Sequence, residues 1–242
     1  MPEKESHLTA AIDRSMRLHR PSIRRILLFP FEMLILAHVG IALLIACYTL
    51  LFAFVTPRIN SLMIFRSLVQ GQRLLPIKPV PLSQIPVVDR NMFILLEDGH
   101  FYKHHGIDLG AIREAYRLNQ RAGYFVRGAS TIDQQLARTL FLTMDKNYYR
   151  KYLEAFIAVE MDALLKKDRI LELYLNSIEW GPGVFGIGQA SMYEFGKPFG
   201  KLTTDQVRRL AAVLPSPLHY TVNTFMRDQG LYERYLFLVN RQ

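Results

Sequence analysis

The feature that most constrains this chain is a run of 23 residues without a charged side chain, from Met33 to Val55. A helix rises about 1.5 Å per residue, so about 20 residues cross the hydrocarbon of a bilayer. The run is longer than a signal-peptide core of about 7–15 residues, and no A-x-A cleavage pattern precedes Thr56 and Pro57. We therefore predict a transmembrane helix that is retained as an anchor. A buried core helix is the alternative.

Basic residues are unevenly distributed around this run. Among the first dozen residues after it, the only basic ones are Arg58 and Arg66. The residues before it include Lys4, Arg14, Arg17, Arg20, Arg24 and Arg25. The positive-inside rule then places the N-terminus in the cytoplasm and everything from Pro57 onward outside the cytoplasmic membrane.

Composition limits what the exported part can be. The only cysteine, Cys47, lies in the apolar run, so we expect no disulfide and a body held by its core alone. Residues 57–242 carry 24 basic and 17 acidic side chains. A basic body beside a bilayer favours anionic partners such as phosphates at the lipid surface. Nucleic acid is excluded by this topology.

Proline and apolar spacing divide the chain into segments. Residues 59–70 have the pattern of an amphipathic helix, whose apolar side chains either rest on the bilayer or pack in the core. Four prolines at positions 76, 79, 81 and 86 exclude a helix there and indicate an extended connector. The predicted segments are a basic cytoplasmic tail (1–32), the transmembrane helix (33–55), a membrane-proximal helix with its connector (56–90) and a globular domain (91–242).

The globular domain shows helical signals and hardly a convincing strand, which predicts an all-α fold. Asp108 and Gly123 fit the two ends of one helix. Ser130 with Asp133 resembles a capping box, and Asp168 fits another N-cap. The glycine-rich residues 181–188 are expected to form a loop. The predicted helices span residues 109–122, 130–142, 148–166, 169–176, 189–195, 205–214 and 231–240.

Residues 97–108 combine three acids, three histidines, a lysine and two aromatic residues, directly after the apolar run Met92–Leu96. An apolar run that ends on Glu97 and Asp98 would bring Glu97 out of a buried helix into a cleft. A half-buried carboxyl in such a place can act as a proton acceptor. The alternative is a solvated turn between two helices.

Residues 128–138 combine a glycine turn with two hydroxyls at a helix start, Ser130 and Thr131. Free N–H groups at a helix N-terminus attract phosphate, and Gln134 and Arg138 lie four residues apart on one face. An anion site is one interpretation of this segment. An ordinary capped helix is the other.

A third segment places Arg150, Lys151 and Glu154 on one helix face. Two cations with a carboxylate suit a pyrophosphate, with the acid ordering the cations or a divalent metal ion. Ordinary helix-surface ion pairs, worth about 0.2–0.5 kcal/mol each, explain the same spacing. The histidines at positions 100, 104 and 105 have no second ligand group at a zinc-like spacing.

Five blocks in order resemble the peptidoglycan glycosyltransferase (transglycosylase) family, which polymerises lipid II, and particularly its monofunctional membrane-anchored members. The blocks are Glu97-Asp98-x-x-Phe101-x-x-His104-x-Gly106; Gly128-Ala129-Ser130-Thr131-Ile132-Asp133-Gln134-Gln135-Leu136-Ala137-Arg138; Arg150-Lys151-x-x-Glu154; Lys167-x-x-Ile170-Leu171-Glu172-x-Tyr174-Leu175-Asn176; and Gly183-x-x-Gly186 with Ala190 and Phe195-Gly196-Lys197. The match covers about residues 60–225, and five ordered motifs are far more specific than one.

The resemblance implies a lysozyme-like, mostly helical fold with a cleft that opens on the membrane. It implies an inverting transfer in which Glu97 is the general base for the 4-hydroxyl of the acceptor sugar and undecaprenyl pyrophosphate leaves. Arg138, Arg150 and Lys151 would neutralise the pyrophosphate. Glu154 would position these cations or a divalent ion, Mg²⁺ or Mn²⁺, and no tightly bound cofactor is expected.

Further roles follow from the same comparison. Ser130, Thr131 and Gln134 would line the donor side of the cleft. Glu172 and Asn176 would tie a helix to the cleft wall, and Asp98 and His104 would support the turn after the base.

The resemblance also implies a location and partners. The protein would cross the bacterial cytoplasmic (inner) membrane once, with its catalytic domain in the periplasm or extracellular space. Its partners would be lipid II, the growing glycan strand and the membrane. We expect no transpeptidase domain after Gln242, so cross-linking would come from transpeptidases or other divisome or elongasome proteins.

Three residues depart from the family pattern. Ala129 replaces a glycine, Arg138 a lysine and Thr139 an asparagine. Arginine keeps the charge but offers a planar fork instead of a point charge. These departures leave open a catalytically impaired scaffold that binds lipid II or cell-wall enzymes. A lytic enzyme that cleaves existing glycan is a second alternative, because it would share the lysozyme-like fold and an essential glutamate.

Overall fold

The computed structural model describes residues 23–143 and 147–241, so most of the predicted cytoplasmic tail lies outside the described residues. Contacts divide the chain into two units, residues 1–45 and 46–242. Each is described by itself.

A single long helix, α2 (Ile23–Phe52), contains all but the last three residues of the predicted span, 33–55. Its apolar part, Leu28–Phe52, is long enough to cross a bilayer. The helix ends three residues before the predicted end at Val55. There Arg169 Nε donates a 2.7 Å hydrogen bond to the carbonyl of Phe52, which satisfies one of the free carbonyls at the helix C-terminus.

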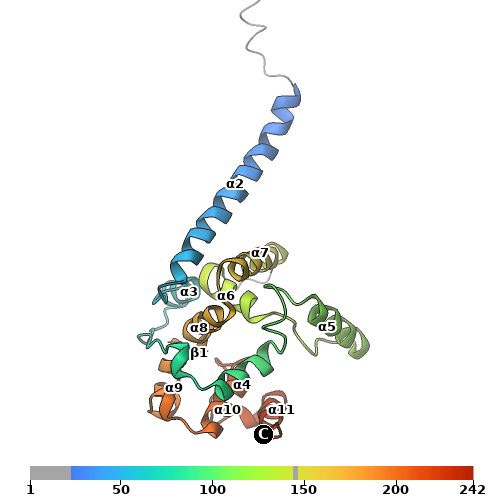
Figure 1. The fold of residues 1–242 in the computed structure, drawn as a ribbon. Coiled ribbons are helices and arrows are strands. Elements are labelled where there is room, and N and C mark those ends of the chain that lie inside the picture. The colour runs from blue at the N-terminus through green and yellow to red at the C-terminus, as the bar shows by residue number, and fades with distance from the viewer. Residues whose placement is uncertain (1–22, 144–146, 242) are drawn as a thin grey trace, which may run out of the picture. The chain divides into compact units, whose positions relative to one another are not determined.

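The body is built from helices and one very small sheet (Figure 1). Its elements are α3 (Ser61–Leu68), η1 (Leu82–Gln84), α4 (Val87–Glu97), α5 (Leu109–Ala122), α6 (Ile132–Phe141), α7 (Tyr148–Leu164), α8 (Lys167–Ser177), β1 (Glu179–Gly181), β2 (Val184–Phe185), α9 (Ile187–Phe195), η2 (Phe199–Lys201), α10 (Thr204–Val213), η3 (Phe225–Arg227) and α11 (Gln229–Val239). The prediction of a mostly helical body after one apolar helix is confirmed.

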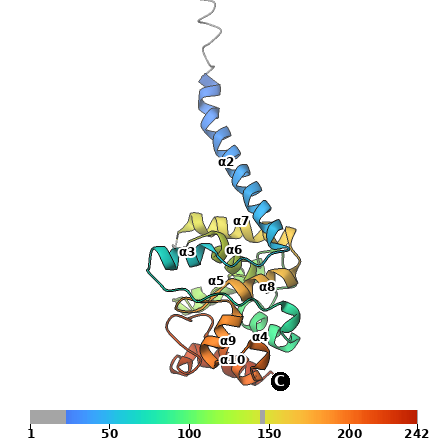
Figure 2. The ribbon, with the colours of Figure 1, turned by 90° about the vertical axis from the view of Figure 1, so that its left-hand side faces the viewer.

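The helices form two groups in the body. α6 packs against α7 and α8, and α10 packs against α4 and α11. Figure 2 shows the first group above and α9 with α10 below. Between the groups, the ring of Phe93 meets the buried Trp180 edge to face, with centroids 5.6 Å apart. Burial of such aromatic side chains is a large part of what holds a disulfide-free domain together.

The glycine-rich segment is a hairpin and not a simple loop. β1 and β2 pair antiparallel, with Glu179 opposite Phe185 and Gly181 opposite Val184. Gly183 makes the turn at φ +71°, a conformation that other residues rarely adopt. The apolar side chains of Val184 and Phe185 are fully buried, so the segment is fixed by the core.

Two helix starts differ from the prediction. The N-cap of α6 is Thr131, in a capping box with Gln134, and not Ser130 with Asp133. α8 begins at Lys167 without a side-chain cap, and Asp168 instead accepts a 2.9 Å hydrogen bond from the Tyr102 hydroxyl. In both places the side chain that was predicted to cap the helix is instead hydrogen-bonded to a residue distant in the sequence: Ser130 to Lys151, and Asp168 to Tyr102.

The proline-rich connector is hydrogen-bonded to α8. Asn176 bonds both polar groups of the Val80 backbone, at 2.8 and 2.9 Å, and Glu172 Oε2 accepts from the Leu82 N–H at 2.6 Å. These contacts tie α8 to the connector, as expected for a structural role of both side chains.

Gly188 permits the close approach of this connector. A Cβ added at Gly188 would lie 2.2 Å from the carbonyl oxygen of Lys78. We expect Gly188→Ala to lower the free energy of unfolding by about 1–3 kcal/mol, despite alanine's better helix propensity, because backbone must move. Denaturant unfolding measures this. Gly200→Ala, which adds its Cβ in open space, is the control, and equal stability of the two variants would contradict the prediction.

Candidate active site

A pocket of about 980 Å³ opens where the end of α4, the starts of α5 and α6, and α11 meet. Polar and charged side chains supply much of its wall. They are Glu97, Asp98, His100, Asp108, Glu114, Arg127, Ser130, Thr131, Gln135, Arg138, Asp228, Glu233 and Arg234. The wall therefore holds carboxylates and guanidinium groups within one cavity.

Glu97 is the last residue of α4, and its side chain is only 11% exposed. Its Oε2 accepts a hydrogen bond of 3.2 Å from Gln135 Nε2. Its Oε1 forms an ion pair with Arg234 Nη2, and Arg234 Nη1 also donates to the carbonyl of Leu96 at 3.2 Å. Both carboxylate oxygens are thus held, which fixes the orientation of the group.

Two of these partners were not predicted as site residues. Gln135 lies in the second sequence block, but nothing in the spacing shows that its amide faces Glu97. Arg234 lies on the predicted last helix, 137 residues after Glu97. A periodic pattern predicts such a helix but not the surface against which it packs.

The turn that follows Glu97 is anchored on the start of α6. Asp98 Oδ2 accepts from the Ile132 N–H at 3.0 Å and lies 2.8 Å from His104 Nε2. Thr131 Oγ1 donates to the Gly106 carbonyl at 2.7 Å. Asp98 and His104 therefore make the contacts expected of supports.

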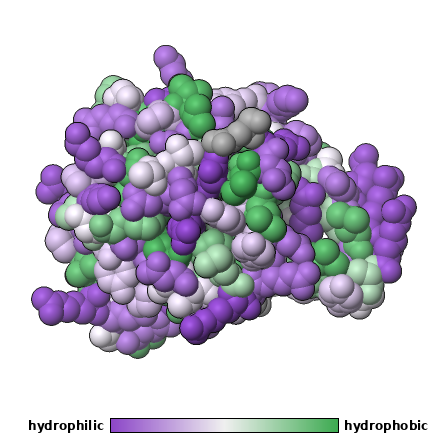
Figure 3. All heavy atoms as spheres, turned by 90° about the horizontal axis from the view of Figure 1, so that it is seen from below, coloured by the Kyte–Doolittle hydropathy of each residue, from purple (hydrophilic) through white to green (hydrophobic). Residues whose placement is uncertain are grey.

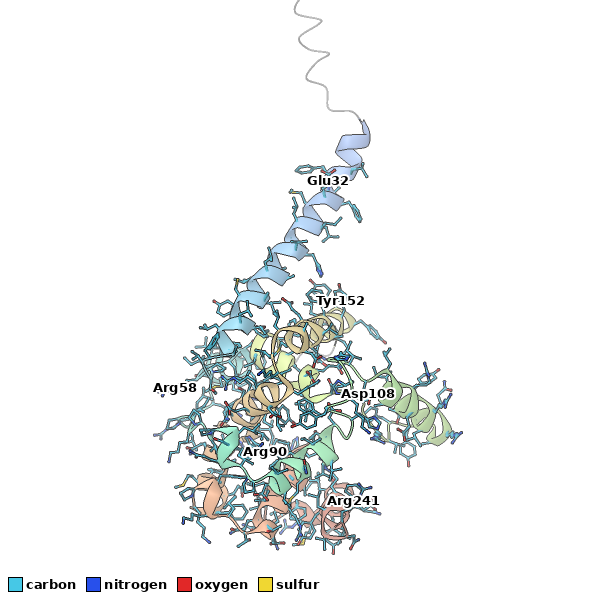
Figure 4. All side chains as sticks on the ribbon, viewed as in Figure 1. Glu32, Arg58, Arg90, Asp108, Tyr152 and Arg241 are labelled. Carbon is cyan, nitrogen blue, oxygen red and sulfur yellow. The ribbon has the colours of Figure 1, made fainter. Side chains whose placement is uncertain are left out.

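A second histidine contact lies at the start of α5. Asp108 caps α5 through the Ala111 N–H at 2.8 Å, and its other oxygen lies 2.8 Å from His100 Nδ1. Burial would raise the pKa of Asp108, but the hydrogen bonds from Ala111 and His100 outweigh it and lower that pKa. Figure 4 shows Asp108 where α5 joins the rest of the body. In Figure 3, α5 is the lobe at right, with apolar and hydrophilic residues side by side.

The predicted cationic face, Arg150 and Lys151 with Glu154, lies at the start of α7 and contacts the loop before α6. Glu154 is fully buried and accepts from both Arg150 and Lys151. Lys151 Nζ also donates to Ser130 Oγ at 2.9 Å. The carboxylate therefore holds two cations in place, and one of them reaches the pocket wall through Ser130.

The structure separates the predicted site residues into two sets. Glu97, Ser130, Thr131 and Arg138 line the pocket. Gln134, Arg150, Lys151 and Glu154 lie outside its lining. The amide oxygen of Gln134 accepts from the Thr131 N–H at 3.1 Å, so this side chain is part of the capping box that fixes the start of α6.

The donor set around Glu154 does not fit a divalent ion as it stands. Ca²⁺ takes 6–8 oxygen ligands, and Mg²⁺ demands near-octahedral geometry. Both oxygens of Glu154 are already occupied by Arg150 and Lys151. Glu154 therefore offers no free oxygen for a metal ion, and the divalent ion stays a prediction.

A cluster of two carboxylates and a histidine lies near the turn that follows Glu97. Asp98, His104 and Asp133 place one ligand atom each within 4.8 Å of one another. Lys167 Nζ occupies this region, at 3.1 Å from Asp133 Oδ2 and 2.6 Å from Asp162 Oδ1. The lysine supplies the positive charge that a metal ion would bring.

Asp133 makes stability depend on pH. Burial raises its pKa from 3.8 to about 6, although Lys167 and His104 oppose the shift and Asp162 adds to it. Between about pH 4 and 6 the folded state keeps a proton that the unfolded state has lost, so the free energy of unfolding falls as pH rises across this window. The contribution is at most about 3 kcal/mol.

Asp133→Asn removes this titration. We expect urea unfolding of the variant to lack that part of the decline between pH 4 and 7, so its stability relative to the natural chain rises with pH. An identical pH dependence in both proteins would contradict the assignment.

Comparison with known proteins relates this chain to transglycosylases. A family model described as Transglycosylase matches residues 70–239. A biosynthetic peptidoglycan transglycosylase of Pseudomonas aeruginosa is 48% identical over 139 residues, which is 57% of this chain and 60% of the relative. One of Neisseria meningitidis serogroup C is 48% identical over 141 residues, 58% and 60% of the two chains. One of Nitrosospira multiformis is 43% identical over 144 residues, 60% and 63%.

The aligned part thus spans about three fifths of the length of these relatives. The family model covers more than half of this chain, including the whole pocket wall. The chain belongs to the transglycosylase family.

Proposed function

We propose that this protein polymerises glycan strands of peptidoglycan from lipid II, as an inverting peptidoglycan glycosyltransferase. The observation that carries the proposal is the arrangement around Glu97. One carboxylate, fixed at both oxygens, faces a large pocket whose wall also holds Arg127, Arg138 and Arg234. The family and the printed names of the relatives support the same reaction.

Glu97 is the general base in this proposal. Its carboxylate takes the proton from the 4-hydroxyl of the acceptor sugar as that oxygen attacks the anomeric carbon of the growing strand. The new carbon–oxygen bond forms as the bond to undecaprenyl pyrophosphate breaks, with inversion at the anomeric carbon. Because pyrophosphate is a good leaving group, no second carboxylic acid is needed, unlike in glycosidases.

Cations stabilise the charge that develops on the leaving group. Arg138 lies in the pocket wall, and Lys151 reaches that wall through Ser130. Arg150 is paired with Glu154, which also orders Lys151. Preorganised positive charge aimed at a developing anion is a large contribution to catalysis.

The departures from the family pattern are compatible with activity. Thr139 Oγ1 donates to the Gln135 carbonyl within its own helix at 2.9 Å, and Thr139 itself does not line the pocket. Arg138 keeps a cation in that wall. These contacts favour an active enzyme over a scaffold.

The proposed location follows from α2. The protein would cross the bacterial cytoplasmic membrane once, with its N-terminus in the cytoplasm and its catalytic body in the periplasm or extracellular space. Transpeptidases of the divisome or elongasome would be its partners, since cross-linking is a separate reaction. A requirement for Mg²⁺ or Mn²⁺ stays part of the proposal, with the ion bound elsewhere than at Glu154, whose two oxygens are occupied by Arg150 and Lys151.

A paired assay distinguishes synthesis from lysis. Purified protein is given either labelled lipid II with and without Mg²⁺ or Mn²⁺, or purified sacculi. We expect glycan polymer from lipid II and no soluble muropeptides from sacculi. Muropeptide release without polymer would identify a lytic enzyme, and binding of lipid II without turnover would identify a scaffold.

A further inference from the structure

A buried chain of hydrogen bonds reaches Glu97 from α8. The Tyr174 hydroxyl donates to Gln135 Oε1 at 3.1 Å, and Gln135 Nε2 donates to Glu97 Oε2 at 3.2 Å. The three residues come from α8, α6 and α4. Tyr174 is fully buried, and it does not line the pocket.

The two ends of the Gln135 amide are not equivalent. With the NH₂ group toward Glu97, both hydrogen bonds are made, because Oε1 accepts from Tyr174. With the amide turned over, its carbonyl oxygen would face a carboxylate oxygen, and two acceptors repel. The carboxylate of Glu97 therefore selects this orientation, and the hydrogen bond from the Tyr174 hydroxyl to Oε1 anchors the amide in it.

This donor is permanently available. Burial, and then the negative charge of Glu97, raise the pKa of Tyr174 well above its ordinary value. The hydroxyl thus keeps its proton throughout the pH range in which a carboxylate can act as a base.

We propose that Tyr174 is a positioning residue for the base: its hydroxyl orients the Gln135 amide and so keeps a hydrogen-bond donor on Oε2 of Glu97. Arg234 holds the other oxygen, so the two contacts together fix the plane of the carboxylate. Tyr174 never touches the substrate. The inference rests on the proposed function only in taking Glu97 as the base.

Tyr174→Phe tests this role in the full-length protein in detergent. We expect kcat for lipid II polymerisation to fall about tenfold, with apparent KM changed less than about twofold, because one donor to the base is lost. Tyr102→Phe, which removes a hydroxyl bonded to Asp168 on the same helix, is the matched control and should behave as the natural chain.

A double-mutant cycle tests whether the effect passes through Gln135. In a Gln135→Met background, Tyr174→Phe should cause no further loss of kcat. A full additional loss there, or natural kinetics in Tyr174→Phe alone, would overturn the proposal.

A second readout needs no turnover. With ¹³C-labelled glutamate, the side-chain carboxyl signal of Glu97, assigned by its absence in Glu97→Gln, should change its chemical shift in Tyr174→Phe and not in Tyr102→Phe. If this change appears while the natural chain makes no glycan, the proposed function fails and the positioning role stands. If the natural chain makes glycan and the signal does not move, the positioning role fails. Thermal unfolding checks the fold, and if Tyr174→Phe unfolds, an unchanged Glu97 signal in Gln135→Met overturns the proposal.

Discussion

Glu97→Gln is expected to lower the rate of glycan polymerisation by about 10²–10⁴-fold, which is the usual contribution of a general base. Glutamine has nearly the same shape, but it cannot accept the proton of the acceptor hydroxyl. It also loses the ion pair with Arg234, so the loss should lie toward the upper end of this range. The side chain lies in the pocket wall and contacts polar partners, not the apolar core, so the variant should still fold.

The rate is measured with labelled lipid II and purified full-length protein, and thermal unfolding checks the fold. Glu194→Gln removes a carboxylate on α9, outside the pocket lining, and should retain the natural rate. Retention of full activity in Glu97→Gln would exclude this carboxylate as the base.

Arg234→Met is expected to lower kcat by about 10–100-fold. Arg234 binds Glu97 Oε1 and the Leu96 carbonyl together, and its removal leaves a carboxylate that is 11% exposed without its charged partner. Loss of one partner of a largely buried pair costs about 3–5 kcal/mol, of which part appears as local disorder of the base. Removal of positive charge from the pocket wall should weaken binding of the anionic substrate as well.

Steady-state kinetics separate these two effects. Arg234→Lys keeps the charge but cannot reproduce the two-pronged contact, so it should restore apparent KM more than kcat. Arg227→Met, in η3 and outside the pocket lining, is the charge-matched control. A kcat unchanged in Arg234→Met would contradict the role of this ion pair.

Local rules predicted local structure well. Asp108 and Gly123 do end α5 as expected, because an N-cap and a left-handed C-terminal residue act within one turn. The N-cap of α6 was placed one residue too early. There Ser130 accepts from Lys151, a residue 21 positions away, and Thr131 takes the cap.

The candidate site was predictable only in part. Glu97 was singled out because an apolar helix ends on it, and the family resemblance gave it the role of base. Ser130 and Thr131 were singled out at a helix start, and Arg138 because it lies four residues after Gln134 on the same helix face. The contacts that give Glu97 its fixed orientation come from Gln135 and Arg234, which lie 38 and 137 residues away. Such contacts depend on how α11 and α6 pack against α4, and spacing along the chain carries no information on that.

The cationic helix face shows the same limit. Spacing predicted that Arg150, Lys151 and Glu154 share one face, and they do. It did not predict that Glu154 would be fully buried. Burial makes these ion pairs more important for stability, because loss of a cation would leave a buried carboxylate unpaired, which costs far more free energy than the same loss at an exposed site.

The most direct test of the account is product analysis with lipid II. Purified full-length protein and its Glu97→Gln variant are incubated side by side with labelled lipid II, and both glycan polymer and undecaprenyl pyrophosphate are measured. We expect the natural chain to yield both, with one undecaprenyl pyrophosphate for each new glycosidic bond, and the variant to yield neither. Absence of polymer from the natural chain, or equal polymer from both proteins, would contradict this expectation.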